Sequence, residues 1–449
     1  MAAGEGRFDE PAGSIPDRRM ALTYLECIEE GCGRRQDPKK EMHQCAWCGG
    51  LLDVRYEFDI TDPEALRSAW HQRRLSGEPI DRSGVWRFRE LLPFVGPHDR
   101  VISLSEGSTP LVGTRRAGWW AGPVHLTIKH QGINPTGSFK DLGMTACITR
   151  AASLGVRMVA CASTGNTSSS MAAYAGRAGM KAVLFVPYRQ ISAAKLAQAL
   201  DFGAVVIEIG DTFDEAFGLL RQVAGEMGFY LVNSINPFRI EGQKTIVAEM
   251  MEQRAWRPPD YIVVPGGNLG NASAIGKGLR ELKELGFIEK VPKVVVIQAA
   301  GANPFFRTLQ AGSPDLIPVE KPDTEATAIR IGRPANWKKA RRVLEWTGGF
   351  CESVTDEEIF EGKAALAEDG VGCEPASAAT VAGIRKLVRA GRIERHADIM
   401  AVLTGHQLKD TDYVIRHHSS EEQSRQRVRV DANLGALRKA LESVLAVPA

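Results

Sequence analysis

The feature that most constrains the fold is a regular alternation of short apolar and longer amphipathic segments between residues 156 and 233. Strands are predicted at residues 158–162, 181–186, 204–209 and 229–232, and helices at residues 168–179, 193–202 and 213–227. Strands joined by helices pair in parallel, because a parallel partner can be reached only by a long crossover. We therefore expect a compact βαβ domain at residues 146–244.

The segments on either side of this domain predict a second, larger α/β domain. They contain strand-like runs at residues 261–264, 294–298 and 399–403 and a predicted helix at residues 272–285. We expect the smaller domain to be inserted into a large domain. The expected parts are a disordered N-terminus (1–20), a zinc-ribbon-like module (21–58), the large domain (59–145 and 245–415) and a C-terminal helical tail (416–449).

Composition and charge argue against several classes of function. The chain has 449 residues, of which 44% are hydrophobic and 24% charged, as in ordinary globular proteins. A net charge of +2 gives no reason to expect a nucleic acid or a membrane as a partner. No apolar run is long enough to span a bilayer, and the N-terminal residues lack the apolar core of a secretory signal. The cytoplasm is the expected location.

Three polar or glycine-rich turns each follow a predicted strand. They lie at residues 163–167, 265–271 and 404–407. Open α/β sheets bind ligands in the crevice at the carboxyl ends of their strands, where such turns lead into helices. The three turns are therefore predicted to line a ligand-binding crevice.

A fourth segment, Asn134–Asp141, places Lys140 before an amphipathic stretch, Leu142–Leu154, that is predicted to be a helix. At a helix start, the backbone N–H groups and the helix dipole disfavour a protonated amine. A lysine with a lowered pKa can act as a nucleophile near neutral pH. The alternative is an ordinary solvated lysine at a helix start.

The turn Gly266–Gly270 is predicted to bind an anion. Glycines let the backbone approach a ligand closely, and backbone N–H groups at a helix N-terminus can hold a phosphate. The turn lacks the ending of a P-loop and the spacing of a dinucleotide fingerprint. A phosphate cradle without a nucleotide motif, together with a lysine able to form a Schiff base, suggests pyridoxal 5′-phosphate (PLP). A tight turn without a ligand is the alternative.

Five motifs, in this order within residues 100–415, resemble the threonine synthase family. They are Asn134–Asp141, Ser163–Thr167, Gly266–Asn271, Glu374–Ala379 and Leu403–His406. Related dehydratases typically have an S-x-G-N-H turn and cysteine synthases a T-S-G-N-T turn, whereas this chain has S-T-G-N-T. The resemblance implies a homodimeric, PLP-dependent enzyme of fold type II, the tryptophan-synthase-β-like fold, with two parallel-sheet α/β domains.

The resemblance also implies which residues bind the cofactor. Lys140 is the expected catalytic residue, which would hold PLP as a Schiff base and move protons. Asn166 would contact the phenolic oxygen of PLP, and Thr404 would face its pyridine nitrogen. A helix cap for Asn166 and a strand-end threonine for Thr404 are the alternatives. The expected cofactor-binding residues are Lys140, Asn166, Gly266, Gly267, Asn268, Leu269, Gly270 and Thr404.

The substrate implied by the resemblance is O-phospho-L-homoserine. Elimination of its γ-phosphate and addition of water at Cβ would give L-threonine, which makes the expected enzyme a carbon–oxygen lyase acting on phosphates. The expected substrate-binding residues are Ser163, Thr164, Asn233 and Arg239. The arginine offers a fork for bidentate phosphate binding, and an arginine on a surface loop is the alternative.

Two other functions stay open on the sequence alone. One is another PLP-dependent lyase or β-replacement enzyme of the same fold, such as threonine dehydratase or cysteate synthase. The other is a non-enzymatic interaction protein with a zinc ribbon and a degenerate PLP fold, although the retained Lys140, Asn166 and Thr404 argue against it. One departure from the family pattern is Gln407, where many relatives have a glycine.

Four cysteines near the N-terminus predict a metal site. Cys45 and Cys48 have the spacing of a zinc knuckle, whereas four residues separate Cys27 from Cys32. Two such pairs predict a structural Zn²⁺ held by four thiolates. A metal-free knuckle or a redox-labile pair is the alternative. No role in catalysis is expected for this metal.

Overall fold

The computed structural model describes residues 22–40, 43–163, 165–187, 193–209, 218–220, 223–224, 227, 229–411, 415 and 429–445. The predicted N-terminal segment, most of the predicted helix at 213–227 and Thr164 lie outside these residues. By their contacts, Met1–Lys409 and Asp410–Ala449 are separate units. The second unit contains α15 (Leu434–Leu445), a helix in the predicted helical tail.

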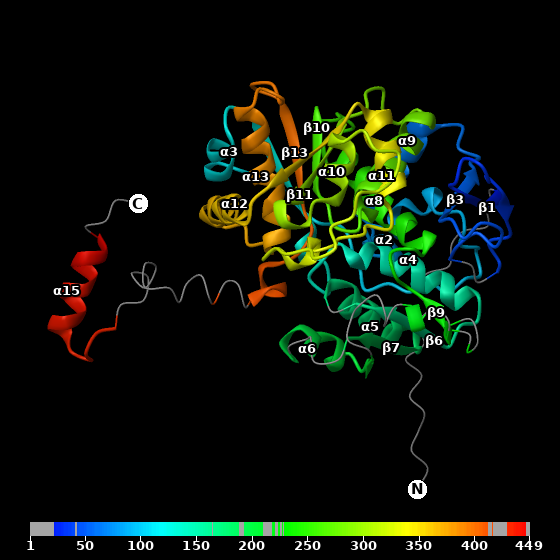
Figure 1. The fold of residues 1–449 in the computed structure, drawn as a ribbon, viewed down its shortest axis with the longest axis horizontal. Helices are drawn as coiled ribbons and strands as arrows, with labels where there is room; N and C mark the ends of the chain where they lie inside the picture. The colour runs from blue at the N-terminus through cyan, green and yellow to red at the C-terminus, as the bar shows by residue number, and fades with distance from the viewer. Residues whose placement is uncertain are drawn as a thin grey trace, which may run out of the picture. The chain divides into compact units, whose positions relative to one another are not determined.

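A six-stranded sheet forms the centre of the first unit (Figure 1). Its strand order is β12-β11-β10-β13-β5-β4, and every pair is parallel except β4 with β5. The strands are β4 (Leu111–Gly113), β5 (His125–His130), β10 (Tyr261–Pro265), β11 (Lys293–Ala299), β12 (Phe350–Val354) and β13 (Asp398–Leu403). The strands predicted in this part of the chain are confirmed.

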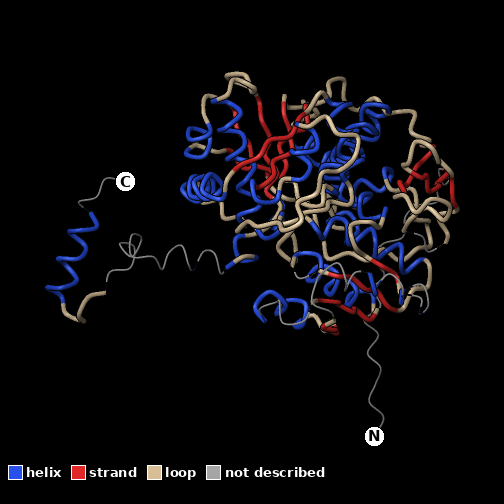
Figure 2. Tube along the Cα trace, viewed as in Figure 1, coloured by secondary structure: helices blue, strands red, loops and turns tan. Residues whose placement is uncertain are grey.

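Helices cover both faces of this sheet (Figure 2). They are α3 (Arg116–Ala121), α8 (Pro237–Gln253), α9 (Gly270–Glu284), α11 (Trp337–Thr347), α12 (Asp356–Glu368) and α13 (Pro375–Arg389). Successive strand residues point to opposite faces. Ile262 and Val264 therefore share a core with α8, α9 and α11, whereas Tyr261 and Val263 share one with α3, α12 and α13. Burial on both faces explains the continuous apolar runs of these strands.

A four-stranded parallel sheet with the order β8-β7-β6-β9 forms the second layered part of the same unit. Its elements are β6 (Met158–Ala162), α5 (Asn166–Ala178), β7 (Lys181–Val186), α6 (Ala193–Asp201), β8 (Val205–Glu208) and β9 (Tyr230–Leu231). All of these strands lie between β5 and β10 in the sequence, as expected for an inserted domain. The two parallel sheets confirm the predicted fold class, and the residue limits of the domains stay predictions.

The N-terminal part forms a three-stranded antiparallel sheet, here called the ribbon (residues 22–57). Its strands β1 (Leu22–Cys27), β2 (Arg35–Gln36) and β3 (Leu52–Glu57) have the order β2-β1-β3. Leu52 and Val54 are fully buried in the same core as α8 and α9. The ribbon is therefore packed against the helices of the large sheet.

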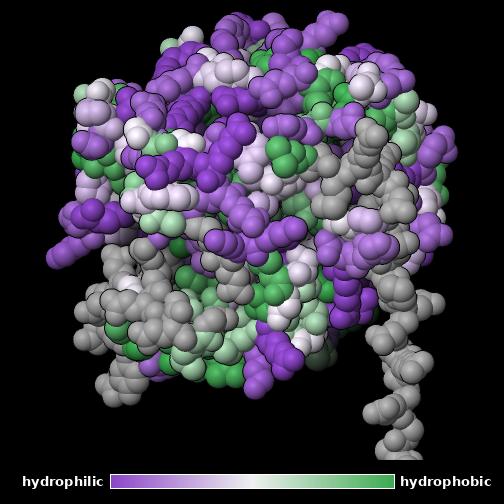
Figure 3. Space-filling view, turned by 90° about the vertical axis from the view of Figure 1, so that its right-hand side faces the viewer, coloured by the Kyte–Doolittle hydropathy of each residue, from purple (hydrophilic) through white to green (hydrophobic). Residues whose placement is uncertain are grey.

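On the face drawn in Figure 3, hydrophobic residues gather mainly in the lower part, where Figure 1 places the small sheet.

Short elements connect these parts. They are α1 (Pro63–Arg74), α2 (Pro79–Arg82), η1 (Trp86–Leu91), η2 (Gln131–Ile133), α4 (Lys140–Ser153), η3 (Ala300–Ala302), α10 (Pro304–Gln310), η4 (Thr327–Ile329) and η5 (Gln407–Lys409). Among the described residues, no helix combines the length and the apolar character needed to cross a bilayer.

Candidate active site

The predicted motifs meet at the carboxyl ends of the parallel strands, as expected for an open α/β sheet. Thr404 follows β13, and the glycine turn follows β10. The segment Asn134–Asp141 lies beside the turn after β13. The backbone N–H of Phe139 donates to the carbonyl of Thr404 at 2.9 Å, and that of His406 donates to the carbonyl of Gly137 at 2.9 Å. These bonds hold the start of α4 against the end of β13.

Close packing of α4 on α8 brings the two cationic site residues together. A Cβ added at Gly242 would overlap the carbonyl of Leu142, and one added at Gly143 would lie 2.8 Å from the carbonyl oxygen of Arg239. Only glycine allows two helix backbones to approach this closely. The first turns of α4 and α8 therefore touch, and Lys140 and Arg239 lie in these turns.

Lys140 is the first residue of α4 and is partly buried. Burial of the amine, together with the positive charge of Arg239, lowers its pKa to about 7, against an opposing contribution from Glu374. Its Nζ lies 3.8 Å from the centre of the Phe139 ring. Among the described residues, no carboxylate lies within salt-bridge distance of this amine. A substantial fraction of this amine is therefore neutral near pH 7, unlike a solvated ammonium group.

Glu374 is a site residue to which the sequence assigned no role, although it begins a recognised motif. Its side chain is 2% exposed and accepts hydrogen bonds from Asn166 Nδ2 (2.9 Å) and Thr404 Oγ1 (3.2 Å). Burial raises its pKa, and the hydrogen bond from Asn166 and the charge of Lys140 oppose this. Glu374 thus joins the helix start after β6 to the turn after β13, and it brings the two predicted ring-contacting residues together.

Thr404 is held in place by the start of α13. The hydroxyl of Ser377 accepts hydrogen bonds from the backbone N–H groups of Thr404 (2.8 Å) and Gly405 (3.0 Å), and it lies 3.0 Å from Thr404 Oγ1. A Cβ at Gly405 would overlap the carboxylate of Glu374, so this position requires glycine. The threonine that follows β13 therefore has a fixed hydroxyl. This is compatible with both roles considered from the sequence, contact with the pyridine nitrogen of PLP and a structural threonine at a strand end.

The glycine turn has the shape of an anion cradle. A Cβ at Gly266 would lie 2.5 Å from Val296, and one at Gly267 would lie 3.0 Å from the carbonyl of Ala328. Leu269 has a positive φ of 62°, and no side chain caps the N-terminus of α9. No hydrogen bond within the described residues uses the backbone N–H groups of residues 267–270. The turn can therefore donate these groups to a bound phosphate.

Two asparagines of this turn differ in what they contact. Asn268 is occupied by protein groups, because its amide donates to Ser234 Oγ and accepts from the backbone N–H of Ala335, both at 2.5 Å. Asn271 is buried, and neither Oδ1 nor Nδ2 has a hydrogen-bond partner within the described residues. A buried amide without partners is costly. Its position in the first turn of α9 identifies it as a further candidate ligand of the cofactor phosphate.

The predicted substrate residues are not equally available. Asn233 accepts a hydrogen bond from the backbone N–H of Ala162 (3.2 Å) and donates one to its carbonyl (2.8 Å), so both ends of the amide are engaged. This pair joins the ends of β6 and β9. Ser163 accepts a long hydrogen bond from the N–H of Gly165 (3.4 Å) and is partly buried. Thr164 lies outside the described residues.

Arg239 lies inside the protein, in the first turn of α8, and is 3% exposed. The alternative of a surface-loop arginine is therefore wrong. One Nη1–H donates to the carbonyl of Val232 (3.1 Å), whereas Nε is buried without a partner among the described residues. Burial lowers the pKa of this guanidinium. No described carboxylate forms a salt bridge with it, so an anionic ligand would relieve a costly buried charge.

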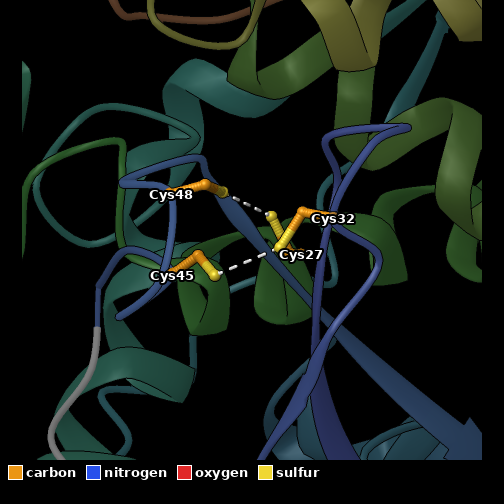
Figure 4. A group of neighbouring side chains, drawn as sticks. All are labelled: Cys27, Cys32, Cys45 and Cys48. Atoms are coloured by element: carbon orange, nitrogen blue, oxygen red, sulfur yellow. Dashed lines mark hydrogen bonds between the residues drawn. The ribbon is translucent and has the colours of Figure 1, made fainter.

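The four N-terminal cysteines converge in the ribbon (Figure 4). All four sulfur atoms lie within 4.8 Å of one another. Cys27 and Cys48 are 3.4 Å apart at their sulfurs, and Cys32 and Cys45 are 3.7 Å apart. Four thiolates at about 2.3 Å from a tetrahedral zinc ion would be separated by about 3.8 Å. The wide Cys27–Cys32 spacing therefore does not prevent the sulfurs from reaching a geometry that fits zinc.

Gln407 causes no conflict within the site. Its exposed side chain lies over Gly372, where an added Cβ would overlap the glutamine amide. His406 forms a backbone bridge with Cys373 on the same side. The departure from the family pattern is thus accommodated by a glycine in the neighbouring segment.

The fold and this crevice define a PLP-dependent α/β enzyme of fold type II. The family model described as "Pyridoxal-phosphate dependent enzyme" matches residues 102–405. Among solved structures, maize serine racemase is similar in fold, with a TM-score of 0.59, 20% identity, and coverage of 75% of this chain and 92% of that one. The cradle, the low pKa of Lys140 and the unpartnered amide of Asn271 all fit PLP.

Two curated relatives narrow the class. The threonine synthase of Methanocaldococcus jannaschii is 43% identical over 419 residues, which cover 93% of this chain and 99% of that protein. The threonine synthase of Methanosarcina acetivorans is 43% identical over 423 residues, which cover 94% of this chain and 99% of that protein. The chain belongs to the threonine synthase family and is a PLP-dependent lyase.

Proposed function

We propose that this enzyme converts O-phospho-L-homoserine and water into L-threonine and phosphate in the crevice formed by α4, α8 and α9. The observation that carries the proposal is the meeting of two basic side chains without carboxylate partners among the described residues, the partly buried Lys140 and the buried Arg239. The lowered pKa of Lys140 suits it to proton transfer, and the guanidinium of Arg239 is suited to bind a phosphate. A substrate that carries both an amino acid centre and a γ-phosphate matches this pair.

PLP supplies an electron sink that stabilises negative charge on the carbon atoms of a bound amino acid. Its phosphate would be held by the N–H groups of Gly267–Gly270 and by the amide of Asn271. Asn166 and Thr404 would contact the ring, and Glu374 would keep both side chains in position. Glu374 is placed in this group because it accepts hydrogen bonds from both.

Lys140 would serve as the base and acid of the reaction. With a pKa of about 7, the amine is suited both to accept a proton from the substrate Cα and to return it near neutral pH. Its neighbours help in two ways. Arg239 keeps the amine from holding its proton too tightly, and Phe139 shields it from water on one side.

Arg239 would bind the γ-phosphate of the substrate. Its guanidinium is confined by burial and by one hydrogen bond to a carbonyl, so little side-chain entropy is lost on binding. Ser163 and Thr164, in the turn after β6, would complete the phosphate site, and Asn233 lies at the end of the adjacent strand. Because the amide of Asn233 is engaged with Ala162, its contribution would be to hold the turn after β6 in place.

We also propose that Cys27, Cys32, Cys45 and Cys48 bind one structural Zn²⁺. The convergence of four sulfurs supports this site, and a stoichiometric measurement of bound zinc in purified protein tests it. A protein that folds with four reactive thiols and no metal would contradict it. The homodimer and the cytoplasmic location expected from the resemblance and the sequence stay predictions.

The deciding experiment is incubation of the purified holoenzyme with O-phospho-L-homoserine, with measurement of phosphate and of the amino acid product. Equal amounts of phosphate and L-threonine are expected. Phosphate with 2-oxobutyrate would instead indicate elimination without controlled addition of water. No phosphate from protein that carries PLP would contradict the proposed substrate.

A further inference from the structure

A cluster of buried charges connects the ribbon to the two helices that begin at the proposed phosphate sites. Lys277 of α9 lies at its centre. Its Nζ contacts Glu241 of α8 at 2.5 Å and Asp53 of β3 at 3.2 Å, and it also donates to the carbonyl of Val54. Although burial opposes the charged form, the carboxylates raise the pKa of Lys277 above its usual value. One ammonium group thus joins three elements.

The cluster continues along both helices and extends to α11. Lys244 of α8 contacts Glu241 and Glu281 of α9, each at 2.7 Å. Lys339 of α11 donates to the carbonyl of Leu52 (2.7 Å) and lies 4.0 Å from Asp53. The members are three carboxylates, three ammonium groups and one guanidinium, which lies 3.4 Å from Asp53: Asp53, Glu241, Glu281, Lys244, Lys277, Lys339 and Arg55. Each charge therefore depends on the others for its compensation.

The cluster lies close to the ligand-binding ends of these helices. Glu241 is two residues from Arg239, in the first turns of α8. Lys277 is two turns from the glycine cradle at the start of α9. A Cβ at Gly278 would lie 2.6 Å from the carbonyl of Lys244, so the two helices have no room to slide past each other at this level.

The ribbon has a second contact with the same region. His43, between the two cysteine pairs, accepts a hydrogen bond from the backbone N–H of Leu231 (3.3 Å) and lies edge-on to Tyr230 at 5.2 Å. Its other ring nitrogen lies 3.5 Å from the amide nitrogen of Asn236. The side-chain oxygen of Asn236 caps α8, because it accepts a hydrogen bond from the backbone N–H of Phe238 (3.0 Å). The ribbon thus contacts α8 at its cap and at its second turn.

We propose that the ribbon is a positioning module for the active site. Through Asp53 and Lys277 it sets the relative placement of the N-termini of α8 and α9, and so the distance between Arg239 and the glycine cradle. Asp53 and Lys277 are positioning residues, because they act through helices and touch neither ligand. The inference rests on the proposed function for the role of Arg239, whereas the role of the cradle follows from the PLP family.

The physical reason is the precision that the two phosphate sites require. A helix moves as a rigid body over a few turns, so a shift at Lys277 is passed to the cradle. Binding geometry must be kept within about 0.5 Å for full effect. A core of apolar side chains fixes helix position less specifically than a set of directional ion pairs whose partners must all be satisfied.

The test compares Asp53→Asn with the matched control Glu90→Gln. Asparagine keeps the size of Asp53 and leaves the pairs between α8 and α9 intact. It weakens the links from β3 to Lys277 of α9 and to Lys339 of α11. Glu90 is also buried and paired, with Arg73 at 2.6 Å, but it joins α1 to η1 and is not a member of the cluster. Asp53→Asn weakens the ion pairs of Asp53 with Lys277, Lys339 and Arg55, whereas Glu90→Gln weakens the pair with Arg73. The melting temperatures of both variants therefore report the general loss of stability separately from the effect on the site.

Two quantities are measured for each variant: the Kd for PLP from titration of the apoenzyme, and the KM and kcat for O-phospho-L-homoserine. We expect Asp53→Asn to raise the Kd and the KM about tenfold and to leave kcat within about twofold, in the range of effects transmitted through packed elements. Glu90→Gln should leave all three within about twofold. An unchanged Kd in Asp53→Asn, or an equal rise in Glu90→Gln, would overturn the proposal.

A second variant tests whether the folded ribbon as a whole carries the effect. Cys48 is exposed, so Cys48→Ser weakens the four-thiolate site with little loss of core packing. If the ribbon acts as one module, the double variant with Asp53→Asn should show about the same Kd for PLP as the more affected single variant. Multiplying effects would contradict a single module. If the wild-type enzyme does not turn over the phosphorylated substrate, the proposed function fails, but the Kd for PLP still decides this inference.

Discussion

Two neighbouring regions around the first turns of α8 differ in how their basic side chains are paired. At the ribbon side, Lys244 and Lys277 each have two carboxylate partners. At the crevice side, neither Lys140 nor Arg239 has a carboxylate partner among the described residues. Arg239 lacks one even though it is buried, with only 3% of its surface exposed. Helix α8 contributes one residue to each region, Lys244 and Arg239, whereas Lys277 belongs to α9 and Lys140 to α4. The comparison teaches that a buried cation paired within the chain holds the structure, whereas one left without an anion is available to a ligand.

The largest expected effect concerns the unpaired amine. Lys140→Ala should lower turnover about a thousandfold or more, because the variant can neither form the Schiff base nor transfer the proton. It should not lower the melting temperature, because no ion pair is lost. Absorbance of bound PLP, turnover and thermal unfolding measure these outcomes. A large loss of stability would show that Lys140 has a structural role after all.

The second effect tests the paired side. Lys277→Met should destabilise the protein by about 2–3 kcal/mol, because Asp53 and Glu241 lose their shared partner while Lys339 and Lys244 continue to compensate them in part. Denaturant unfolding of the apoenzyme measures this. A loss below about 1 kcal/mol would mean that the cluster contributes little, and the contrast between the two regions would disappear.

The third effect concerns Arg239 in the crevice. Arg239→Met should raise the KM for O-phospho-L-homoserine about 10- to 100-fold, because the γ-phosphate loses a charged hydrogen-bond partner. Its effect on the free energy of unfolding should stay within about 1 kcal/mol, since one hydrogen bond to a carbonyl is lost and a buried charge is removed. Arg239→Lys keeps the charge without the fork and should give an intermediate KM. An unchanged KM in Arg239→Met would assign the phosphate to other residues.

The smallest effect is a change in pH dependence. Formation of the Schiff base by apoenzyme and PLP requires the neutral amine, so its rate should rise with pH through about 7. Removing the positive charge in Arg239→Met should move this midpoint to higher pH, and removing the negative charge in Glu374→Gln should move it to lower pH. Stopped-flow absorbance at a series of pH values gives the midpoint. An unchanged midpoint in both variants would show that burial alone sets the pKa of Lys140.

Much of the fold could be predicted from local patterns. Continuous apolar runs such as Tyr261–Pro265 and Lys181–Val186 are strands that are buried on both faces of parallel sheets, and their length and flanking turns distinguish them from helices. Lys140, the glycine turn and Thr404 were found because their motifs are contiguous. The position of Arg239 was misjudged in one alternative, because a loop-like sequence after Asn233 gave no sign that Pro237 begins a buried helix.

Other site features could not be predicted, because they depend on residues far apart in the sequence. Glu374 matters through hydrogen bonds from Asn166 and Thr404, which lie 208 and 30 residues away. Asn271 stands out only because its buried amide has no partner, a property that no motif displays. The charge cluster of the ribbon joins β3 to α9 across 224 residues. Long-range electrostatic compensation leaves no local signal in a sequence.

The sequence by itself determined the chemistry that this protein has available: a lysine at a helix start, a glycine turn after a strand, four cysteines in two pairs and two parallel α/β sheets. These follow from backbone preferences and side-chain periodicity, which act over a few residues. Only the tertiary structure decided which of the buried cations are paired. Charge compensation depends on distances between helices, and those distances are set by close glycine-mediated packing such as that of Gly242 on α4.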